Sequence, residues 1–248
     1  MAETSLSKIH KITVILPARN EESALPCVLA EINLAKTLLP DVDIQALVVD
    51  NNSSDHTAEV AKNNNATVIY CKKKGKGNAF RTALSHSLLD SSDIVIMADA
   101  DSTYPLIINI YKIAELVSER NDVVIGYRDN LKRGSMTKLN YFGNKLLSAI
   151  TTLLYRYHIR DVCSGLWGFK KDTLLGFHLT SPEFTLEADL FTNAYYSHCR
   201  IAQFPISYRA RIGESSAKFK PVIDWFKILR FLIKRRVKPC HPLLYLLL

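Results

Sequence analysis

The sequence predicts an α/β fold of one domain, in which helices flank a mostly parallel, wound sheet. Three observations indicate this fold. Short apolar runs alternate with longer segments that carry apolar residues at helical spacing, as in repeated strand–helix units. The run Ile94–Ala98 is apolar throughout, as expected of a strand buried on both faces. Polar residues, among them Arg19, Asp50 and Asp99, follow directly where such runs end.

The first half of the chain supplies alternating strands and helices. The apolar runs predict strands at Lys11–Leu16, Ile44–Val49, Thr67–Tyr70, Ile94–Ala98 and Val123–Gly126. Apolar residues at helical spacing predict helices at Glu22–Leu39, Thr57–Asn64, Asn78–Leu89 and Leu106–Arg120. Because parallel strands end at the same edge of a sheet, we expect the polar residues behind them to converge on one rim.

The second half is less regular. It predicts helices at Met136–Tyr155, Phe184–Tyr196 and Val222–Arg236, strands at Trp167–Lys170 and Ile201–Ser207, and loops at Asp161–Gly168 and Tyr208–Lys220. The chain has no internal repeat and no clear linker. We therefore expect one domain over residues 1–220, with one ligand handled by residues 11–130 and another by residues 131–220. A basic amphipathic helix and an apolar tail follow over residues 221–248.

The composition is that of a globular protein with a hydrophobic core and an anionic partner. Of the 248 residues, 48% are hydrophobic and 23% are charged, and the net charge is +8. That charge favours nucleic acid, a phosphorylated ligand or an acidic membrane surface as partner. The five cysteines form no Cys-x-x-Cys pair, which disfavours a disulfide framework or a zinc site and favours reduced thiols in the cytoplasm.

The C-terminal region combines positive charge with apolar side chains. The helix Val222–Arg236 carries Trp225, Phe226 and Leu229 among lysines and arginines. Such a helix lies at an anionic membrane surface or packs its apolar stripe on the domain. The segment Pro242–Leu248 is too short to span a bilayer, but its apolar character favours the membrane. Since no signal peptide is visible, we expect a cytoplasmic protein at the cytoplasmic face of a membrane.

The stretch Asp93–Pro105 carries the clearest chemical signal. Asp99 and Asp101 follow a buried strand, where two carboxylates are unfavourable unless a positive charge compensates them. Mg²⁺ or Mn²⁺ fits, because such a cation takes oxygen ligands and leaves positions open for substrate phosphates. The alternative is a pair of solvated loop aspartates.

Two common enzyme classes lack their motifs. No G-x-G-x-x-G follows the first strand and no G-x-x-x-x-G-K-[ST] occurs, which disfavours a dinucleotide-binding enzyme and a P-loop ATPase. The seven histidines stand apart from plausible nucleophile turns, so no Ser-His-Asp set is recognisable.

Several segments resemble the ordered motifs of one family. Pro17–Glu21, Val48–Asp55, Gly75–Ala79 and Asp99–Asp101 resemble those of family-2 inverting glycosyltransferases, most closely the dolichyl-phosphate mannose synthase type and its polyprenyl-phosphate relatives. The likeness extends from about Ile12 to Lys220. It implies a GT-A fold, a nucleotide-diphosphate sugar donor and a divalent cation, Mg²⁺ or Mn²⁺.

The resemblance assigns most candidate residues to the donor. Asp101 binds the metal with Asp99, and Thr103 stands where the mannose synthases often carry a glutamine ligand. Lys76, between two glycines, suits a phosphate contact. The set implied for the nucleotide sugar is Pro17, Arg19, Glu21, Asp50, Asn52, Lys76, Asp99, Ala100, Arg128, Arg209, Arg211 and Lys218.

Some of these residues have simpler interpretations. Glu21 also suits a helix N-terminus, and Asn51 and Asn52 suit a turn. The segment Tyr208–Ser215 resembles the family's late basic loop, which closes over the diphosphate and neutralises the leaving group. The alternative is a solvated basic loop.

The acceptor residues are implied by two further segments. Asp161–Gly165 resembles the family's D-x-x-S-G, in which Ser164 and Gly165 donate hydrogen bonds to an anion. Leu166 and Trp167 replace the usual Phe-Arg that follows. Glu187, the second candidate catalytic residue beside Asp101, falls where inverting relatives carry an acid; it is a general base for a hydroxyl acceptor or an orienting group for a phosphate.

We therefore expect a metal-dependent, inverting hexosyltransferase that uses polyprenyl or dolichyl phosphate as acceptor and has no nucleic-acid partner. Two alternatives stay open. One is transfer to a soluble or polysaccharide hydroxyl. The other is a non-catalytic protein that binds anions or nucleic acid through its basic surface, although no aromatic-basic recognition motif supports it.

Overall fold

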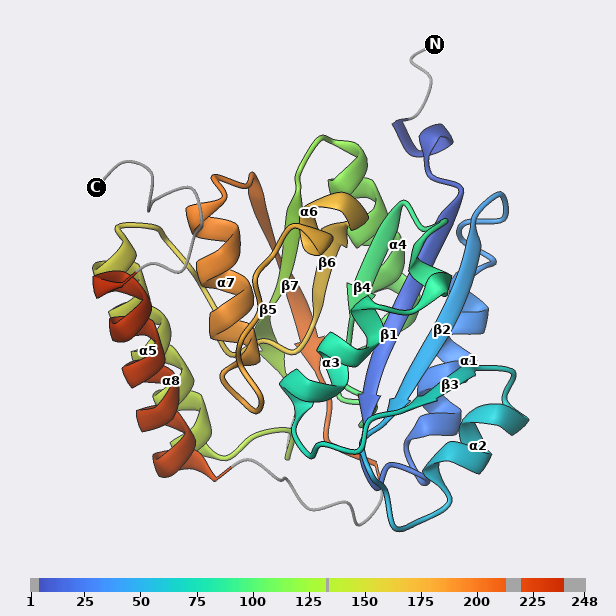
Figure 1. The fold of residues 1–248 in the computed structure, drawn as a ribbon, viewed down its shortest axis with the longest axis horizontal. Helices are drawn as coiled ribbons and strands as arrows, with labels where there is room; N and C mark the ends of the chain where they lie inside the picture. The colour runs from blue at the N-terminus through green and yellow to red at the C-terminus, as the bar shows by residue number, and fades with distance from the viewer. Residues whose placement is uncertain (1–4, 133, 213–219, 239–248) are drawn as a thin grey trace.

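The computed structural model describes residues 5–132, 134–212 and 220–238. A seven-stranded sheet runs through the molecule with helices on both faces (Figure 1). The strand order is β3-β2-β1-β4-β6-β5-β7. The strands are β1 (Lys11–Ala18), β2 (Asp43–Asp50), β3 (Thr67–Tyr70), β4 (Ile94–Met97), β5 (Val123–Leu131), β6 (Trp167–Lys170) and β7 (Ile201–Tyr208).

Most neighbouring strands are parallel, which confirms the predicted fold class. β1 pairs in parallel with β2 and β4, β2 with β3, and β5 with β7. β6 lies between β4 and β5 and is antiparallel to both. The carboxyl ends of β1, β2 and β4 therefore meet at one edge of the sheet, the lower edge in Figure 1.

The helices form two layers because successive residues of a strand face opposite sides. Ile12 and Val14 of β1 pack with α1 and α4 on one face. Ile15 packs with α3, α7 and α8 on the other. The helices are η1 (Ser5–Lys8), α1 (Leu25–Ala35), α2 (Thr57–Asn63), α3 (Lys76–Leu84), η2 (Ser87–Leu89), α4 (Leu106–Ser118), α5 (Lys138–Tyr155), α6 (Lys171–Leu175), α7 (Leu186–Tyr196) and α8 (Pro221–Val237).

The boundaries differ from the sequence expectation at several places. The first long helix begins only at Leu25, with a proline in its first turn, and ends at Ala35. α3 ends at Leu84, and the expected continuation to Leu89 is the separate 3₁₀ turn η2. β5 extends beyond Gly126 because its later residues pair with β7 across a register shift near Arg128. The short helix α6 was not predicted.

The amphipathic helix α8 packs on α5 and α7. The Trp225 ring lies against Gly143, where a Cβ would come within 2.0 Å of the ring. The Tyr155 hydroxyl donates to the carbonyl of Leu232 at 2.8 Å, and the Tyr196 hydroxyl donates to that of Arg235 at 3.0 Å. Among the described residues, no helix is both long enough and apolar enough to cross a bilayer. The tail predicted at residues 242–248 lies outside them.

Candidate active site

A cavity of about 720 Å³ opens at the carboxyl edge of the sheet. Ligand pockets are commonly of this size and occur at this edge of α/β sheets. The loops that follow β1 and β4 form its wall together with the first turns of α3, α7 and α8. The predicted site residues in the wall are Pro17, Arg19, Glu21, Lys76, Asp99, Ala100, Asp101, Thr103, Arg128, Glu187 and Arg211.

The carboxylate of Asp101 is buried and fixed in orientation. Its Oδ1 accepts hydrogen bonds from the backbone N–H and the hydroxyl of Thr103, at 3.1 and 2.6 Å. Its Oδ2 lies 2.6 Å from Nη2 of Arg211. Burial raises the pKa of Asp101, Asp99 adds to that effect, and Arg211 opposes it. Thr103 therefore orients Asp101, and its role as a metal ligand stays a prediction.

The ammonium of Lys76 joins two carboxylates from distant parts of the chain. Its Nζ lies 2.6 Å from Oδ1 of Asp99 and 2.5 Å from Oε1 of Glu187. Burial alone would lower the pKa of Lys76, but the two carboxylates outweigh it and hold this pKa well above its usual value. Burial raises the pKa of Glu187, and Lys76 opposes that effect. Lys76 thus stays charged between the end of β4 and the first turn of α7.

The turn that carries Lys76 depends on its glycines. A Cβ on Gly75 would come within 2.2 Å of the carbonyl oxygen of Pro182, and one on Gly77 within 2.1 Å of that of Ser181. Gly75 also has φ = +122°, where a side chain is strained. The N–H of Gly75 donates to Oδ1 of Asn51 at 2.7 Å. Asn51 therefore ties the end of β2 to the lysine turn.

Gly165 leaves space for the carboxylate of Asp99. A Cβ at this position would come within 2.1 Å of Oδ2 of Asp99. The N–H of Gly165 donates to the hydroxyl of Tyr104 at 2.8 Å. Ser164 is fully buried, and its hydroxyl donates to the carbonyl of Gly126. Ser164 and Gly165 are outside the cavity wall, so their contact with the acceptor stays a prediction.

Arg128 forms a buried ion pair in the cavity wall. Its Nε and Nη2 donate to the two carboxylate oxygens of Asp161 at 2.6 and 2.7 Å. Its guanidinium also lies 5.3 Å from the ring centroid of Tyr208. Burial would lower the pKa of Arg128, but Asp161 outweighs it and raises this pKa well above its usual value. The guanidinium is therefore a permanent, fixed charge in the wall.

Three predicted donor residues lie outside the cavity wall. Oδ1 of Asp50 accepts the N–H of Ser53 at 3.1 Å, and Asn52 has φ = +59°, which is turn geometry. Nη1 of Arg209 lies 2.5 Å from Oε1 of Glu31. Their nucleotide contacts stay predictions. The predicted residue Lys218 lies outside the described residues.

The structure adds wall residues that the sequence did not indicate as binding groups. Tyr104 is one of them. It follows Asp101 by only three positions, so its closeness to the paired aspartates in the sequence could have indicated it. Asp224 lies in the first turn of α8, with Oδ2 accepting the N–H of Lys220 at 2.7 Å. No sequence pattern indicates that this turn reaches the cavity.

The carboxylate oxygens of Asp99 and Asp101 are suitable ligands for a divalent cation. Carboxylate oxygens are the ligands that Mg²⁺ and Mn²⁺ take in proteins. Within the described part of the chain, no group of three or more His, Cys, Asp and Glu side chains is placed to hold a metal ion. Asp99 and Asp101 are the two residues that would hold such a cation.

A mostly parallel sheet with paired aspartates, a glycine-lysine turn and arginines around one cavity defines a glycosyltransferase that takes sugar from a nucleotide sugar. The family model described as glycosyl transferase family 2 matches residues 13–175. The chain belongs to this family and is an enzyme. The open alternative of a non-catalytic anion-binding protein is therefore not retained.

Named relatives agree with this assignment. The chain is 27% identical to glycosyltransferase AglJ of Haloferax volcanii over 235 residues, which are 94% of this chain and 74% of the relative. It is 29% identical to dolichyl-phosphate hexose transferase of the same organism over 204 residues, 82% of this chain and 85% of the relative.

A solved structure confirms the GT-A fold. Glucosyl-3-phosphoglycerate synthase of Mycobacterium tuberculosis, crystallised with Mn²⁺, UDP-glucose and phosphoglyceric acid, matches with a TM-score of 0.69 at 22% identity. The match covers 96% of this chain and 82% of that one.

Proposed function

We propose that this enzyme transfers a hexose from a nucleotide-diphosphate sugar to a polyprenyl or dolichyl phosphate, with inversion and with Mg²⁺ or Mn²⁺. The observation that carries the proposal is the distribution of charge around one cavity. The carboxylates of Asp99 and Asp101 at the end of β4 and the guanidinium of Arg128 on β5 line the same cavity. A dolichyl-phosphate hexose transferase among the relatives supports the acceptor class.

Residues 11–130 supply the donor side. Asp101, with Asp99, holds the metal, which when bound stabilises the negative charge of the leaving diphosphate. Arg211 reaches the same carboxylate and also lies 3.5 Å from Glu21, so its guanidinium is within reach of a diphosphate bound there. Pro17, Arg19 and Ala100 line the cavity beside these charged groups, where the rest of the nucleotide sugar fits.

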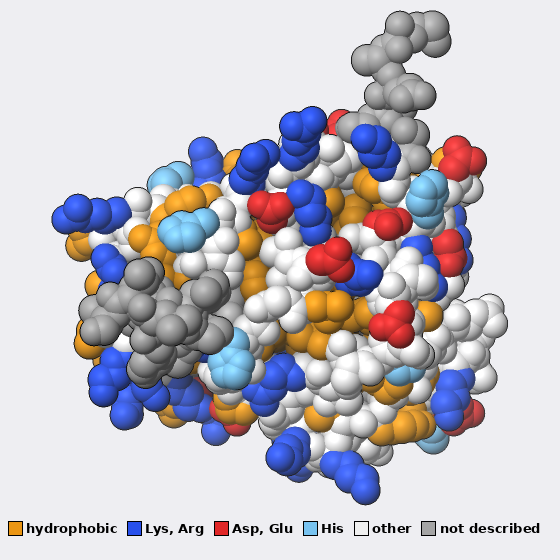
Figure 2. Space-filling view, turned by 45° about the horizontal axis from the view of Figure 1, so that its top comes forward, with side chains coloured by type: hydrophobic (Ala, Val, Ile, Leu, Met, Phe, Trp, Pro, Cys, Tyr) orange, Lys and Arg blue, Asp and Glu red, His pale blue; other side chains and the backbone are white. Residues whose placement is uncertain are grey.

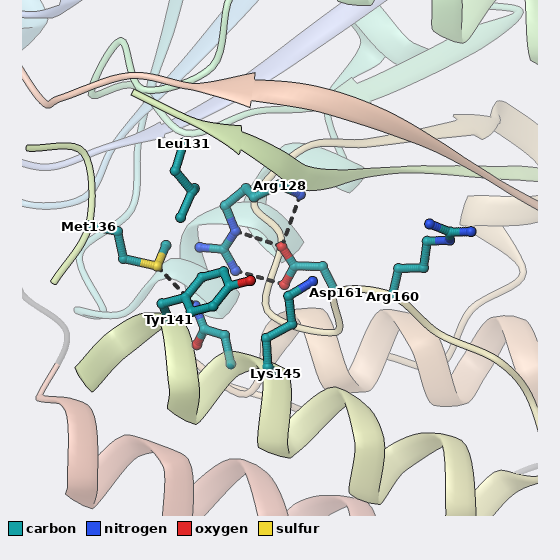
Figure 3. A pocket seen from close by; sticks show the side chains of 8 residues that line it. Arg128, Leu131, Met136, Tyr141, Lys145, Arg160 and Asp161 are labelled. Carbon is teal, nitrogen blue, oxygen red and sulfur yellow. Dashed lines mark hydrogen bonds and ion pairs between the residues drawn. The ribbon is translucent and has the colours of Figure 1, made fainter. Parts of the chain in front are cut away.

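A cationic recess adjoins the acceptor side of the cavity. Its volume is about 10 Å³, and it shares Arg128, Met136 and Asn144 with the large cavity. Figure 3 shows Lys145 directed from α5 toward the pair of Arg128 and Asp161, whereas Arg160 points away, with its guanidinium 4.8 Å from the ring centroid of Tyr127. A recess of this size has room for about one water molecule, so a phosphate group would bind in the large cavity, where Arg128 lines the wall.

The contacts of Glu187 fit a phosphate acceptor better than a hydroxyl acceptor. A phosphate monoester is already ionised near pH 7 and needs no base, whereas an attacking hydroxyl must lose a proton. Glu187 is bonded to the ammonium of Lys76, so its carboxylate orients that cation. We assign Glu187 an orienting role, and Ser164 and Gly165 a supporting one behind the acceptor site.

The outer faces of α5 and α8 support contact with a membrane. α5 exposes Leu139, Phe142, Leu146 and Leu153, and α8 exposes Val222, Ile223, Phe226, Ile233 and Val237. Figure 2 shows several lysine and arginine side chains at the left end of the molecule, the end that carries these helices in Figure 1, and others along the top and bottom. Apolar side chains among cations suit an anionic membrane surface, and we place the enzyme at its cytoplasmic face.

The test is a transfer assay with several donors and acceptors side by side. Radiolabelled UDP-glucose, UDP-galactose and GDP-mannose are each offered with dolichyl phosphate, undecaprenyl phosphate, 3-phosphoglycerate or free sugars, in Mg²⁺, Mn²⁺ or EDTA. We expect metal-dependent label in lipid phosphate with the β-anomer, and no product from Asp101→Ala. Label only in soluble acceptors would contradict the proposed acceptor, and full activity in EDTA would contradict the metal.

A further inference from the structure

We propose that Arg235 of α8 and Asp189 of α7 form a positioning pair that holds Lys76 between Asp99 and Glu187. The inference rests on the proposed function, because it concerns the rate of the transfer step. Neither residue contacts the cavity. Their effect reaches it through a chain of hydrogen bonds and close backbone contacts.

The first link is a buried ion pair. Asp189 is fully buried, and its Oδ1 lies 2.6 Å from Nη2 of Arg235, whose side chain is 6% exposed. Oδ1 also accepts a hydrogen bond from Nδ2 of Asn193 at 3.0 Å. An aspartate at 0% exposure is stable as an anion only with partners of this kind. Arg235 is therefore the counter-charge that pairs with Asp189 and holds its side chain in place.

The second link joins Asp189 to the segment before α7. Oδ2 of Asp189 accepts the backbone N–H groups of Thr180 and Ser181 at 2.6 and 2.8 Å. Nη2 of Arg235 donates to the hydroxyl of Thr180 at 3.0 Å. Two charged side chains thus fix two consecutive residues of an irregular segment against α7.

The third link joins that segment to the lysine turn. The carbonyl of Pro182 accepts the N–H of Asn78 at 3.1 Å, and the carbonyl of Ser181 accepts Nη1 of Arg81 at 2.9 Å. At Gly75 and Gly77 these carbonyls approach so closely that no Cβ fits between. Backbone lies directly against backbone, so a shift of residues 181–182 moves the turn that carries Lys76.

The last link is again on α7. Glu187, which bonds Lys76, stands on the same helix as Asp189 and only two residues before it. α7 thus positions Glu187, which bonds the ammonium of Lys76, and through Asp189 it also positions residues 181–182, which contact the turn that carries Lys76. A displacement of about 1 Å at a reacting group reduces turnover by about a hundredfold in other enzymes. Loss of the pair therefore reduces kcat/KM for the donor, because Lys76 pairs with Asp99 at the end of β4.

The test compares an uncharged pair with the natural one. The double variant Arg235→Met with Asp189→Asn removes both charges together, so that no buried ion is left unpaired. In the lipid-phosphate assay we expect kcat/KM for the donor to fall by about tenfold. Arg235→Lys, which keeps a positive charge, should give an intermediate kcat/KM. Arg200→Met, at an exposed arginine before β7, should match wild type.

A double-mutant cycle separates positioning from general weakening of the fold. If the pair acts through Lys76, its removal has no further effect on kcat/KM in a Lys76→Met background. If the losses multiply, or if kcat/KM is unchanged in both the double variant and Arg235→Lys, the inference is wrong. A wild-type enzyme inactive with every acceptor would instead refute the proposed function.

Discussion

Nη2 of Arg211 lies 2.6 Å from Oδ2 of Asp101, the carboxylate that we assign to the metal. A divalent cation and this guanidinium would compete for the same oxygen. Because Arg211 also approaches Glu21, it has a second carboxylate to which it can move. Under the proposed function, metal binding at the end of β4 would therefore displace Arg211 of the late basic segment.

Arg211→Gln should separate the competition of Arg211 with the metal from its stabilisation of the leaving group. We expect the variant to bind Mn²⁺ several-fold more tightly without nucleotide, because a competing cation is gone. Its kcat should fall by about ten- to a thousandfold, because one charge that stabilises the leaving group is lost. Mn²⁺ titration followed by electron paramagnetic resonance, with steady-state kinetics, checks both. Weaker Mn²⁺ binding would show that the arginine does not compete with the metal.

Gly165→Ala should disturb Asp99 without touching the substrate. The new Cβ would overlap Oδ2 of Asp99, so the carboxylate must leave its place beside Lys76. We expect kcat to fall by about a hundredfold and the free energy of unfolding to fall by about 1–3 kcal/mol. Gly176→Ala is the control, since the nearest atom to its Cβ lies at 3.4 Å. Equal kinetics for both variants would refute the role of Gly165.

The pair of Arg128 and Asp161 should matter for stability as well as for the acceptor. Asp161→Asn leaves a buried guanidinium without its counter-charge, which typically costs about 3–5 kcal/mol. Urea unfolding should show this loss. Replacing both residues by Leu should recover part of the stability but not the activity with lipid phosphate. A loss below about 1 kcal/mol for Asp161→Asn would mean that the pair is not as buried as described.

The lowered pKa of Asp122 predicts that the stability of the fold depends on pH. Burial would raise its pKa, but hydrogen bonds from Lys170 at 2.8 Å and from the N–H of Arg200 at 2.9 Å outweigh it and lower the pKa from 3.8. A lowered folded-state pKa gives stability that is present above the unfolded pKa and is lost as the pH falls through the folded one. Asp122→Asn should thus cost about 1 kcal/mol at pH 7 and little near pH 3.

Chemical unfolding of wild type and Asp122→Asn across that pH range measures the difference. Asp41→Asn, at an exposed turn residue, is the matched control for the loss of one surface carboxylate. A constant difference between wild type and Asp122→Asn at both pH values would contradict the lowered pKa.

The convergence of Pro17, Asp99 and Asp101 on one cavity was predictable from the sequence because it depends on strands. Apolar runs place Pro17 near the end of β1 and the two aspartates beyond β4, and parallel pairing then brings those ends to one edge. The glycine-lysine turn was also recognisable, since two glycines around one lysine indicate close backbone approach. Asp50 and Asn52 stand at a turn outside the cavity wall, where Ser53 donates to Asp50 and Asn52 has a positive φ, so their nucleotide contacts stay predictions.

The partners of charged residues were not predictable, because they depend on packing between distant segments. Arg128 and Asp161 are 33 positions apart, and Asp189 and Arg235 are 46 apart. Nothing local indicates either pairing. The motif around Ser164 indicated an anion donor, but its hydroxyl is used by the Gly126 carbonyl inside the core. Only tertiary structure shows which polar groups remain available to a ligand.

The central claim is that Asp99 and Asp101 hold a divalent cation that binds the diphosphate of the donor. The most direct measurement is calorimetric titration of UDP and GDP into wild type and Asp101→Asn, with Mn²⁺ and with EDTA. We predict that wild type binds one of the two nucleotides in Mn²⁺ and loses at least about tenfold in affinity in EDTA, about 1.4 kcal/mol, and that Asp101→Asn binds weakly in both. Equal affinity with and without metal, or an undiminished Asp101→Asn, would contradict the claim.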